Sequence, residues 1–269
     1  MSREYLVLFY TSLMRTCKSI ILILGGALTV VSGGDALAAD NGKNNVETTS
    51  KVFSLHLGAT RVIYNPNLTG ATLSVINDQN YPILVQSEVL AEDRKSHAPF
   101  IVTPPLFRLD GGQSSHLRII RTSGEFPSDR ETLQWVCVKG IPPKEGDKWA
   151  EVDKDKKTDN KMSMQVQLSV KNCIKLFFRP SSVKGHSDVA ASQIAWQRSG
   201  EKLKGTNSTP FYINLSELTI GGWKVKEHLY ISPFSSVDYD LPVGASGKVQ
   251  WRVINDYGGK SNLFVADVK

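Results

Sequence analysis

The segment Met162–Val170, MSMQVQLSV, decides the fold class. Apolar residues occupy every second position of this segment, and Ser or Gln occupies each position between them. These apolar residues are Met162, Met164, Val166, Leu168 and Val170. A period of two predicts a β-strand with one apolar face. Such a face usually packs on the core of its own domain. Long, flexible Met side chains also suit an adaptable binding surface. The segment alone therefore leaves both interpretations open.

The residues just before this strand have a different composition. Lys144–Lys161 is rich in Lys, Asp and Glu, and its few apolar residues include Trp149 and Val152. We expect a long mobile loop here, because a loop of more than about 15 residues in a compact domain is usually functional or disordered. A solvated insertion without a role is the alternative interpretation.

Short alternating runs continue outward along the chain in both directions. Examples are Phe53–Leu57, Ile83–Val89, Trp135–Val138, Phe211–Leu215 and Val249–Val253. Turn-forming residues separate the runs, and no long stretch has a helical period. Many short strands at this spacing predict a β-sandwich.

The run of strands starts again after residues 179–180, which predicts a joint between two domains. We expect an N-terminal domain at 40–180, which carries the strand and the charged loop, and a C-terminal domain at 181–269.

The first 39 residues have the features of a signal peptide. Arg15 and Lys18 precede the apolar run Ile20–Val31, and Ala36–Ala38 supplies a small-residue cleavage signal. The run is shorter than the roughly 20 apolar residues that span a bilayer, so a membrane anchor is the less favoured alternative. Translation could begin at Met1 or at Met14 within this segment. The sequence thus predicts an exported protein.

Charge and cysteine content limit the partners and the compartment. The formal net charge is +6, but the basic residues do not form a stripe, which argues against a nucleic-acid partner. Cys17 lies in the predicted signal peptide. The remaining pair, Cys137 and Cys173, favours a disulfide in an exported chain, although two buried free thiols are the alternative.

The sequence contains none of the residue patterns that catalysis or metal binding would need. The histidines, at 56, 97, 116, 186 and 228, do not pair with each other or with Cys at ligand spacing. Nucleophile-elbow, zinc-protease and phosphate-loop motifs are absent. We therefore expect no enzyme activity, no metal and no cofactor.

The run FPSDRETLQWVCVKGIPP, Phe126–Pro143, resembles the signature of the periplasmic pilus chaperones of chaperone–usher pathways. Further similarity lies in Thr103–Leu109, Asn172–Pro180 and Ile254–Gly259. The cysteine pair, the extended N-terminal segment and the long charged loop are similar to one subfamily. That subfamily assembles the capsular and pH-regulated fimbrial antigens of Yersinia-type bacteria.

This resemblance implies an all-β fold of two immunoglobulin-like β-sandwich domains in a boomerang arrangement. It also implies a periplasmic chaperone that lends a strand to an incomplete fibre subunit and delivers that subunit to an outer-membrane usher. The row Met162–Val170 would be the donor strand. Alternatives are that the chain is itself a fimbrial subunit or adhesin, or an exported enzyme such as a copper–zinc dismutase. The sequence leaves open whether the free chaperone self-associates.

The resemblance also implies roles for single residues. Arg61 and Lys175 match the pair that holds the carboxylate at the subunit's C-terminus. Glu131, Arg179 and Asp256 match a network that ties the two domains together. A third group matches the surface that docks on the usher, and its members are Pro82, Leu84, Gln86, Thr103, Pro104, Pro105 and Arg118.

Overall fold

The computed structural model describes residues 47–53, 55–144, 147–150, 163–226 and 230–269. Within residues 47–53 and 163–168 only the backbone is described. The predicted signal peptide, Met162 and most of the charged loop lie outside the described residues. In the described part of the chain, no helix is long and apolar enough to cross a membrane.

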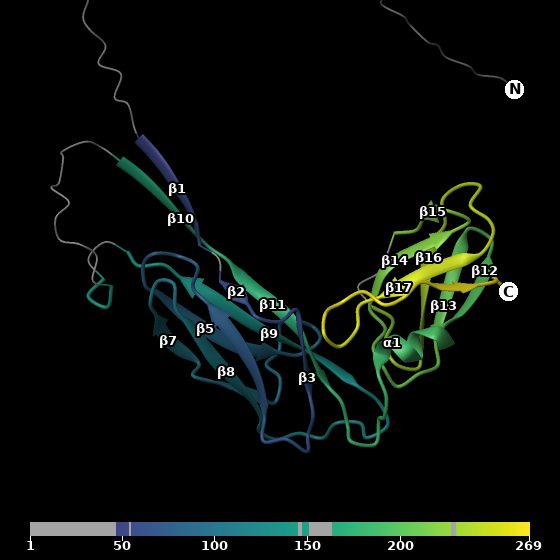
Figure 1. The fold of residues 1–269 in the computed structure, drawn as a ribbon, viewed down its shortest axis with the longest axis horizontal. Coiled ribbons are helices and arrows are strands. Elements are labelled where there is room, and N and C mark those ends of the chain that lie inside the picture. The colour runs from purple at the N-terminus through teal and green to yellow at the C-terminus, as the bar shows by residue number, and fades with distance from the viewer. Residues whose placement is uncertain (1–46, 54, 145–146, 151–162, 227–229) are drawn as a thin grey trace, which may run out of the picture. The chain divides into compact units, whose positions relative to one another are not determined.

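The N-terminal half is a sandwich of two sheets (Figure 1). One sheet has the order β2 (His56–Leu57), β4 (Ala71–Ile76), β8 (Ser114–Arg121) and β6 (Phe100–Thr103). The other has the order β3 (Arg61–Tyr64), β11 (Lys171–Phe178), β9 (Thr132–Ile141), β5 (Ile83–Leu90) and β7 (Leu106–Leu109). All neighbours within these two sheets are antiparallel except β3 and β11, which run parallel.

Alternating side chains fill the space between these two sheets. On β8, Leu117 and Ile119 are fully buried, whereas Arg118 between them is exposed. On β4, Leu73 and Val75 face the same core. Alternation of apolar and polar residues in the sequence therefore gives each strand one apolar face toward the core, as is usual in a β-sandwich with solvated outer faces.

The C-terminal half is a second sandwich with its own core. One sheet has the order β12 (Ala195–Ser199), β13 (Lys202–Asn207) and β16 (Ser235–Asp240). The other has the order β15 (Trp223–Lys224), β14 (Leu215–Ile220), β17 (Val249–Val253) and β18 (Phe264–Ala266). A short helix α1 (Ser187–Ala190) and a 3-10 turn (Ala191–Gln193) precede the first strand. Trp251 and Tyr239 are the largest fully buried side chains of this core.

Two further strands continue from the N-terminal sandwich. β1 (Glu47–Phe53) and β10 (Ser163–Ser169) pair in parallel, from Glu47 opposite Ser163 to Phe53 opposite Ser169. β10 leads through Val170 directly into β11, so this strand of the five-stranded sheet continues beyond the sandwich into the two-stranded ribbon.

The predicted fold class is confirmed, because the regular secondary structure of the described residues is almost all β-strand and is arranged in two sandwiches. The limits 40–180 and 181–269 stay predictions. Phe211–Leu215 differs from the expected strand. β14 begins only at Leu215, and before it Ile213 forms an isolated bridge with Ile231.

Candidate functional site

Two cations lie side by side on the outer face of the five-stranded sheet. The parallel register of β3 and β11 places Arg61 opposite Lys175, and the antiparallel register of β11 and β9 places Lys175 opposite Trp135. Paired residues on neighbouring strands share a face. The three side chains therefore form one row, on the face opposite to core residues such as Leu176.

Lys175 is partly buried by residues of the C-terminal sandwich. Its Nζ donates a hydrogen bond to Oδ1 of Asn214 and lies 5.1 Å from the ring centroid of Tyr230. Burial lowers the pKa of Lys175 to about 8, and the charges of Arg61 and Arg94 act in the same direction. An anion that binds here would relieve this repulsion and raise the pKa again.

Arg61 is more deeply buried, with only 9% of its surface exposed. One terminal nitrogen donates to the carbonyl oxygen of Ile254 at 3.0 Å, whereas its buried Nε has no partner among the described residues. Burial lowers the pKa of Arg61, although the carboxylates of Asp256 and Glu131 oppose this effect. A planar guanidinium beside an ammonium is well suited to bind a carboxylate.

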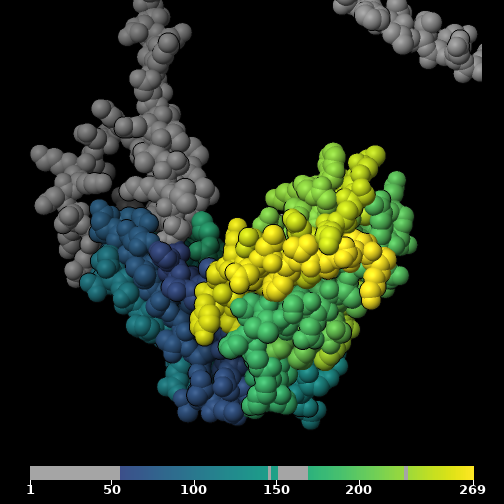
Figure 2. Space-filling model, turned by 45° about the vertical axis from the view of Figure 1, so that its right-hand side comes forward, coloured from purple at the N-terminus to yellow at the C-terminus, as the bar shows by residue number. Residues whose placement is uncertain are grey.

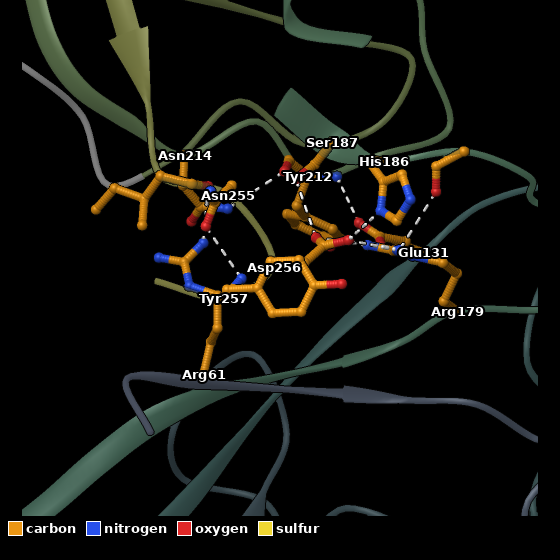
Figure 3. A network of polar contacts seen from close by, with 12 residues as sticks. Arg61, Glu131, Arg179, His186, Ser187, Tyr212, Asn214, Asn255, Asp256 and Tyr257 are labelled. Atoms are coloured by element: carbon orange, nitrogen blue, oxygen red, sulfur yellow. Dashed lines mark hydrogen bonds and ion pairs between the residues drawn. The ribbon is translucent and has the colours of Figure 1, made fainter. Parts of the chain in front are cut away.

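A buried ion network joins the two sandwiches next to this pair (Figure 3). Nε of Arg179 donates to Oε1 of Glu131 at 2.7 Å, and its two terminal nitrogens donate to the two oxygens of Asp256 at 2.8 Å each. Oε2 of Glu131 accepts the backbone N–H of Tyr212 at 2.8 Å. The structure thus brings together all three residues that the resemblance assigns to an interdomain network.

The network also sets the ionisation of its carboxylates. Burial alone would raise the pKa of Asp256, but the hydrogen bonds and charge of Arg179 outweigh it and hold that pKa below its usual value. For Glu131, burial is the larger effect and raises the pKa against the opposing charge of Arg179. One guanidinium therefore serves two carboxylates in different environments.

A second polar link between the sandwiches was not predicted from the sequence. Glu92 lies in the turn after β5, and its carboxylate accepts the hydroxyl groups of Tyr230 at 2.8 Å and Tyr212 at 3.3 Å. Its backbone carbonyl accepts Nε1 of Trp135 at 3.3 Å. The two tyrosines are thereby held over the sheet face that carries Lys175.

Asn214 was also missed by the sequence reasoning. It is 3% exposed, and it contacts Lys175 through its side chain and Ile254 through its backbone. A polar amide within the apolar run Phe211–Leu215 was the available signal, because a buried amide needs hydrogen-bond partners.

The structure contains the disulfide between Cys137 and Cys173, with a sulfur–sulfur distance of 2.08 Å. The two residues are register partners on β9 and β11. The bond therefore fastens β11 to its neighbour just after the chain leaves β10.

Most of the expected donor row lies in or next to β10. Met164, Val166 and Leu168 belong to β10, and Val170 is the partly buried residue that links β10 to β11. Among the described residues, β10 pairs only with β1, so its second edge has no strand partner there. Sequence reasoning did not predict β1 as the neighbour of this row.

The residues expected to dock on an usher fall on two sheets. Thr103 and Arg118 are register partners and exposed on the outer face of the four-stranded sheet. Leu84 and Gln86 lie on β5, on the outer face of the other sheet, and Pro82 lies just before β5.

Pro104 and Pro105 connect β6 to β7 and so link these two faces around one edge of the sandwich. The oxygen of Pro104 accepts the Ser87 hydroxyl, which holds the connection against β5. The predicted group is therefore a surface that bends around an edge and is not one flat patch.

Comparison with known proteins places this geometry in a family. Residues 54–184 match the family described as "Pili and flagellar-assembly chaperone, PapD N-terminal domain". Residues 189–264 match "Pili assembly chaperone PapD, C-terminal domain". Together the two matches cover nearly all the described residues.

Similar proteins and solved structures agree with these matches. The chain is 61% identical to the chaperone protein AfaB of Escherichia coli over 237 residues, which cover 86% of this chain and 96% of that protein. It is 48% identical to the chaperone protein PsaB of Yersinia pestis over 83% of this chain and 87% of PsaB.

Among solved structures, the E. coli chaperone DraB superposes with a TM-score of 0.73 at 63% identity, over 82% of this chain and 100% of DraB. A chain from the Salmonella enterica complex of SafA pilin with the SafB chaperone superposes with a TM-score of 0.74 at 47% identity. That match covers 83% of this chain and 100% of the other. The two-sandwich fold, the family matches and these relatives together show that the chain belongs to the PapD-like family of pilus-assembly chaperones.

Proposed function

We propose that this chaperone lends strand β10 to an incomplete fibre subunit and holds that subunit's C-terminal carboxylate between Arg61 and Lys175. The observation that carries the proposal is the continuity of the strand. β10 has one edge without a strand partner among the described residues, and it runs directly into the strand that bears Lys175. An unpaired strand edge is a template for pairing with another chain.

The sequence pattern supports the same role for β10. Ile174 and Leu176 on β11 face the core of the N-terminal sandwich. The apolar alternation of Met162–Val170 continues their even-numbered series beyond the sandwich. A groove that lacks one strand would accept this row in place of its own, because the row offers an apolar face and backbone hydrogen bonds together.

The cation pair would fix how far the donor strand enters the groove. Ser169 and Lys175 are six residues apart, which is about 20 Å along an extended strand. A carboxylate held at Lys175 sets the subunit at one position along this length. A slip of one residue would turn every apolar side chain to the wrong face.

The relatives support subunit binding and indicate further partners. The solved complex of SafA pilin with SafB is a complex between a pilin and a chaperone related to this chain. We further propose export to the periplasm by the segment 1–39 and delivery to an outer-membrane usher. Our candidate for the usher contact is the bent surface formed by Pro82, Leu84, Gln86, Thr103, Pro104, Pro105 and Arg118. The role is a binding role, and we assign no catalytic residue.

Neutralising each of two lysines on the same strand tests the anchor. Lys175→Gln removes the ammonium next to Arg61, whereas Lys171→Gln removes an exposed ammonium four residues earlier that pairs with Glu88. Each variant is co-expressed with a candidate fibre subunit, and the subunit that co-purifies from the periplasm is quantified.

We expect Lys175→Gln to lose most of the subunit, because a hydrogen-bonded buried charge pair that loses one partner typically costs about 2–5 kcal/mol. Lys171→Gln should recover the normal amount. Equal recovery with both variants, when both have normal circular dichroism, would show that Lys175 is not the anchor.

A further inference from the structure

We infer that Tyr257 is a specificity residue that contacts the side chain of the subunit's last residue. This inference rests on the proposed anchor at Arg61 and Lys175. Tyr257 is 88% exposed, whereas Tyr64, Tyr212 and Tyr239 are all buried. Single exposed aromatic residues are common on protein surfaces, so exposure alone carries no argument. Tyr257 differs from such residues in that its loop is closed by hydrogen bonds and contacts the residues next to the anchor.

The loop is closed by hydrogen bonds within its own residues. Oδ1 of Asn255 accepts the backbone N–H groups of Tyr257 at 3.1 Å and Gly259 at 2.9 Å. The backbone N–H of Asn255 donates to the carbonyl of Gly259 at 2.8 Å, and the N–H of Gly258 donates back to the carbonyl of Asn255. The backbone at Tyr257 is therefore fixed, and its ring is presented from a defined position.

The residues on both sides of Tyr257 are fastened to the N-terminal sandwich. Asp256 is held by Arg179. A Cβ atom at Gly258, where φ is +88°, would lie 2.4 Å from Oγ1 of Thr60. Only glycine combines this left-handed backbone with so close an approach. Figure 2 shows yellow atoms of the C-terminal part of the chain next to blue atoms of the N-terminal sandwich.

These contacts place the loop that carries the exposed ring beside the anchor. Thr60 is the residue before Arg61, and Arg61 itself donates to the carbonyl of Ile254 at the start of the same loop. Figure 3 shows Tyr257 and Arg61 in this group. A carboxylate held by Arg61 and Lys175 belongs to the last residue of the bound chain. The side chain of that residue then lies within reach of the Tyr257 ring.

The chemistry of the ring indicates which side chains it would favour. A tyrosine ring offers a large apolar surface with a negative face. It gains most from contact with an aliphatic or planar side chain and gains nothing from glycine. We therefore expect a preference for subunits that end in an apolar or planar residue.

A double-mutant cycle with peptides tests this preference. The probe is a fluorescein-labelled nonapeptide that copies the C-terminus of a subunit that co-purifies with the chaperone. It is made with Leu or Gly as its last residue, and the Leu peptide is also made as a C-terminal amide. Affinities are measured by fluorescence anisotropy for the unaltered protein and for Tyr257→Ala, Tyr257→Phe, Arg61→Ala and Trp223→Ala.

Trp223→Ala is the matched control for loss of an exposed aromatic residue. Trp223 is 53% exposed and pairs with Ile220, at the end of the sheet opposite to the loop that follows Val253. Circular dichroism and thermal melting establish that each variant is folded.

We expect Tyr257→Ala to weaken the Leu peptide about tenfold and the Gly peptide less than about twofold. Tyr257→Phe and Trp223→Ala should bind both peptides like the unaltered protein. If Tyr257→Ala changes both peptides equally or not at all, while Arg61→Ala and the amide abolish binding, the role of Tyr257 is wrong and the anchor stands. If Arg61→Ala and the amide bind normally, the anchor itself is wrong and the inference fails with it.

Discussion

Replacing Glu131 by alanine should destabilise the protein through the network that joins the two sandwiches. The Glu131 side chain is 1% exposed and accepts two hydrogen bonds, from Arg179 at 2.7 Å and from the backbone N–H of Tyr212 at 2.8 Å. Its removal leaves the Tyr212 N–H buried without its acceptor and leaves Arg179 with Asp256 as its one remaining carboxylate partner among the described residues. Breaking a buried ion pair by removing one partner costs about 3–5 kcal/mol.

We expect the lower end of this range, about 3 kcal/mol, because Arg179 keeps both hydrogen bonds to Asp256. Glu131→Gln should cost about 1–2 kcal/mol, since the amide oxygen can still accept from Tyr212 and only the charged hydrogen bond with Arg179 is lost. The free energy of unfolding is measured by urea titration with tryptophan fluorescence.

Asp129→Ala is the control for this prediction. Asp129 also forms an ion pair with an arginine, Arg130, but both side chains are exposed. Exposed pairs contribute little, so this variant should unfold at the same urea concentration as the unaltered protein. A loss below about 1 kcal/mol for Glu131→Ala would contradict the reasoning. So would an equal loss for the alanine and glutamine variants, because the Tyr212 hydrogen bond would then contribute nothing.

Two further predictions concern pH and the disulfide. Subunit binding should weaken as the pH rises above about 8. Lys175, with a pKa of about 8, loses its proton in the free protein, whereas a bound carboxylate favours the protonated form. Fluorescence anisotropy with the labelled peptide should show lower affinity at pH 9.5 than at pH 7, and equal affinities would argue against Lys175 as a ligand. Replacing Cys137 and Cys173 together by alanine opens a loop of 36 residues. It should lower the free energy of unfolding by about 4 kcal/mol, because the unfolded chain gains entropy. An unchanged midpoint of urea unfolding would rule out this contribution of the disulfide.

The strands themselves could largely be predicted from the sequence, but their partners could not. Alternating apolar and polar residues predict a strand at Val249–Val253, and β17 has these bounds. The register of Arg61 against Lys175 depends on a parallel pairing between segments that are 114 positions apart in the sequence. Local alternation carries no information about such a pairing, so the anchor pair was named only through the family resemblance.

Contacts supplied by the C-terminal sandwich were the hardest part of the site to predict. Asn214, Tyr212 and Tyr230 contact Lys175 or Glu131 across the boundary between the two sandwiches, at positions far apart in the sequence. Their sequence surroundings read as an ordinary apolar strand. Long-range packing overrode that local pattern, and residues 211–214 serve the contact between the sandwiches instead of pairing as a regular strand.

The most direct test of the donor-strand claim compares two neighbouring positions of β10. Val166 belongs to the apolar row, and Gln167 belongs to the polar positions between. Val166→Asp would bury an unpaired carboxylate in an apolar groove, which costs several kcal/mol. Gln167→Asp introduces the same charge on the other side of the strand. The measurement is the amount of subunit that co-purifies from the periplasm with each variant. We predict loss of the subunit with Val166→Asp and normal recovery with Gln167→Asp, whereas equal recovery with both would contradict donation of this strand.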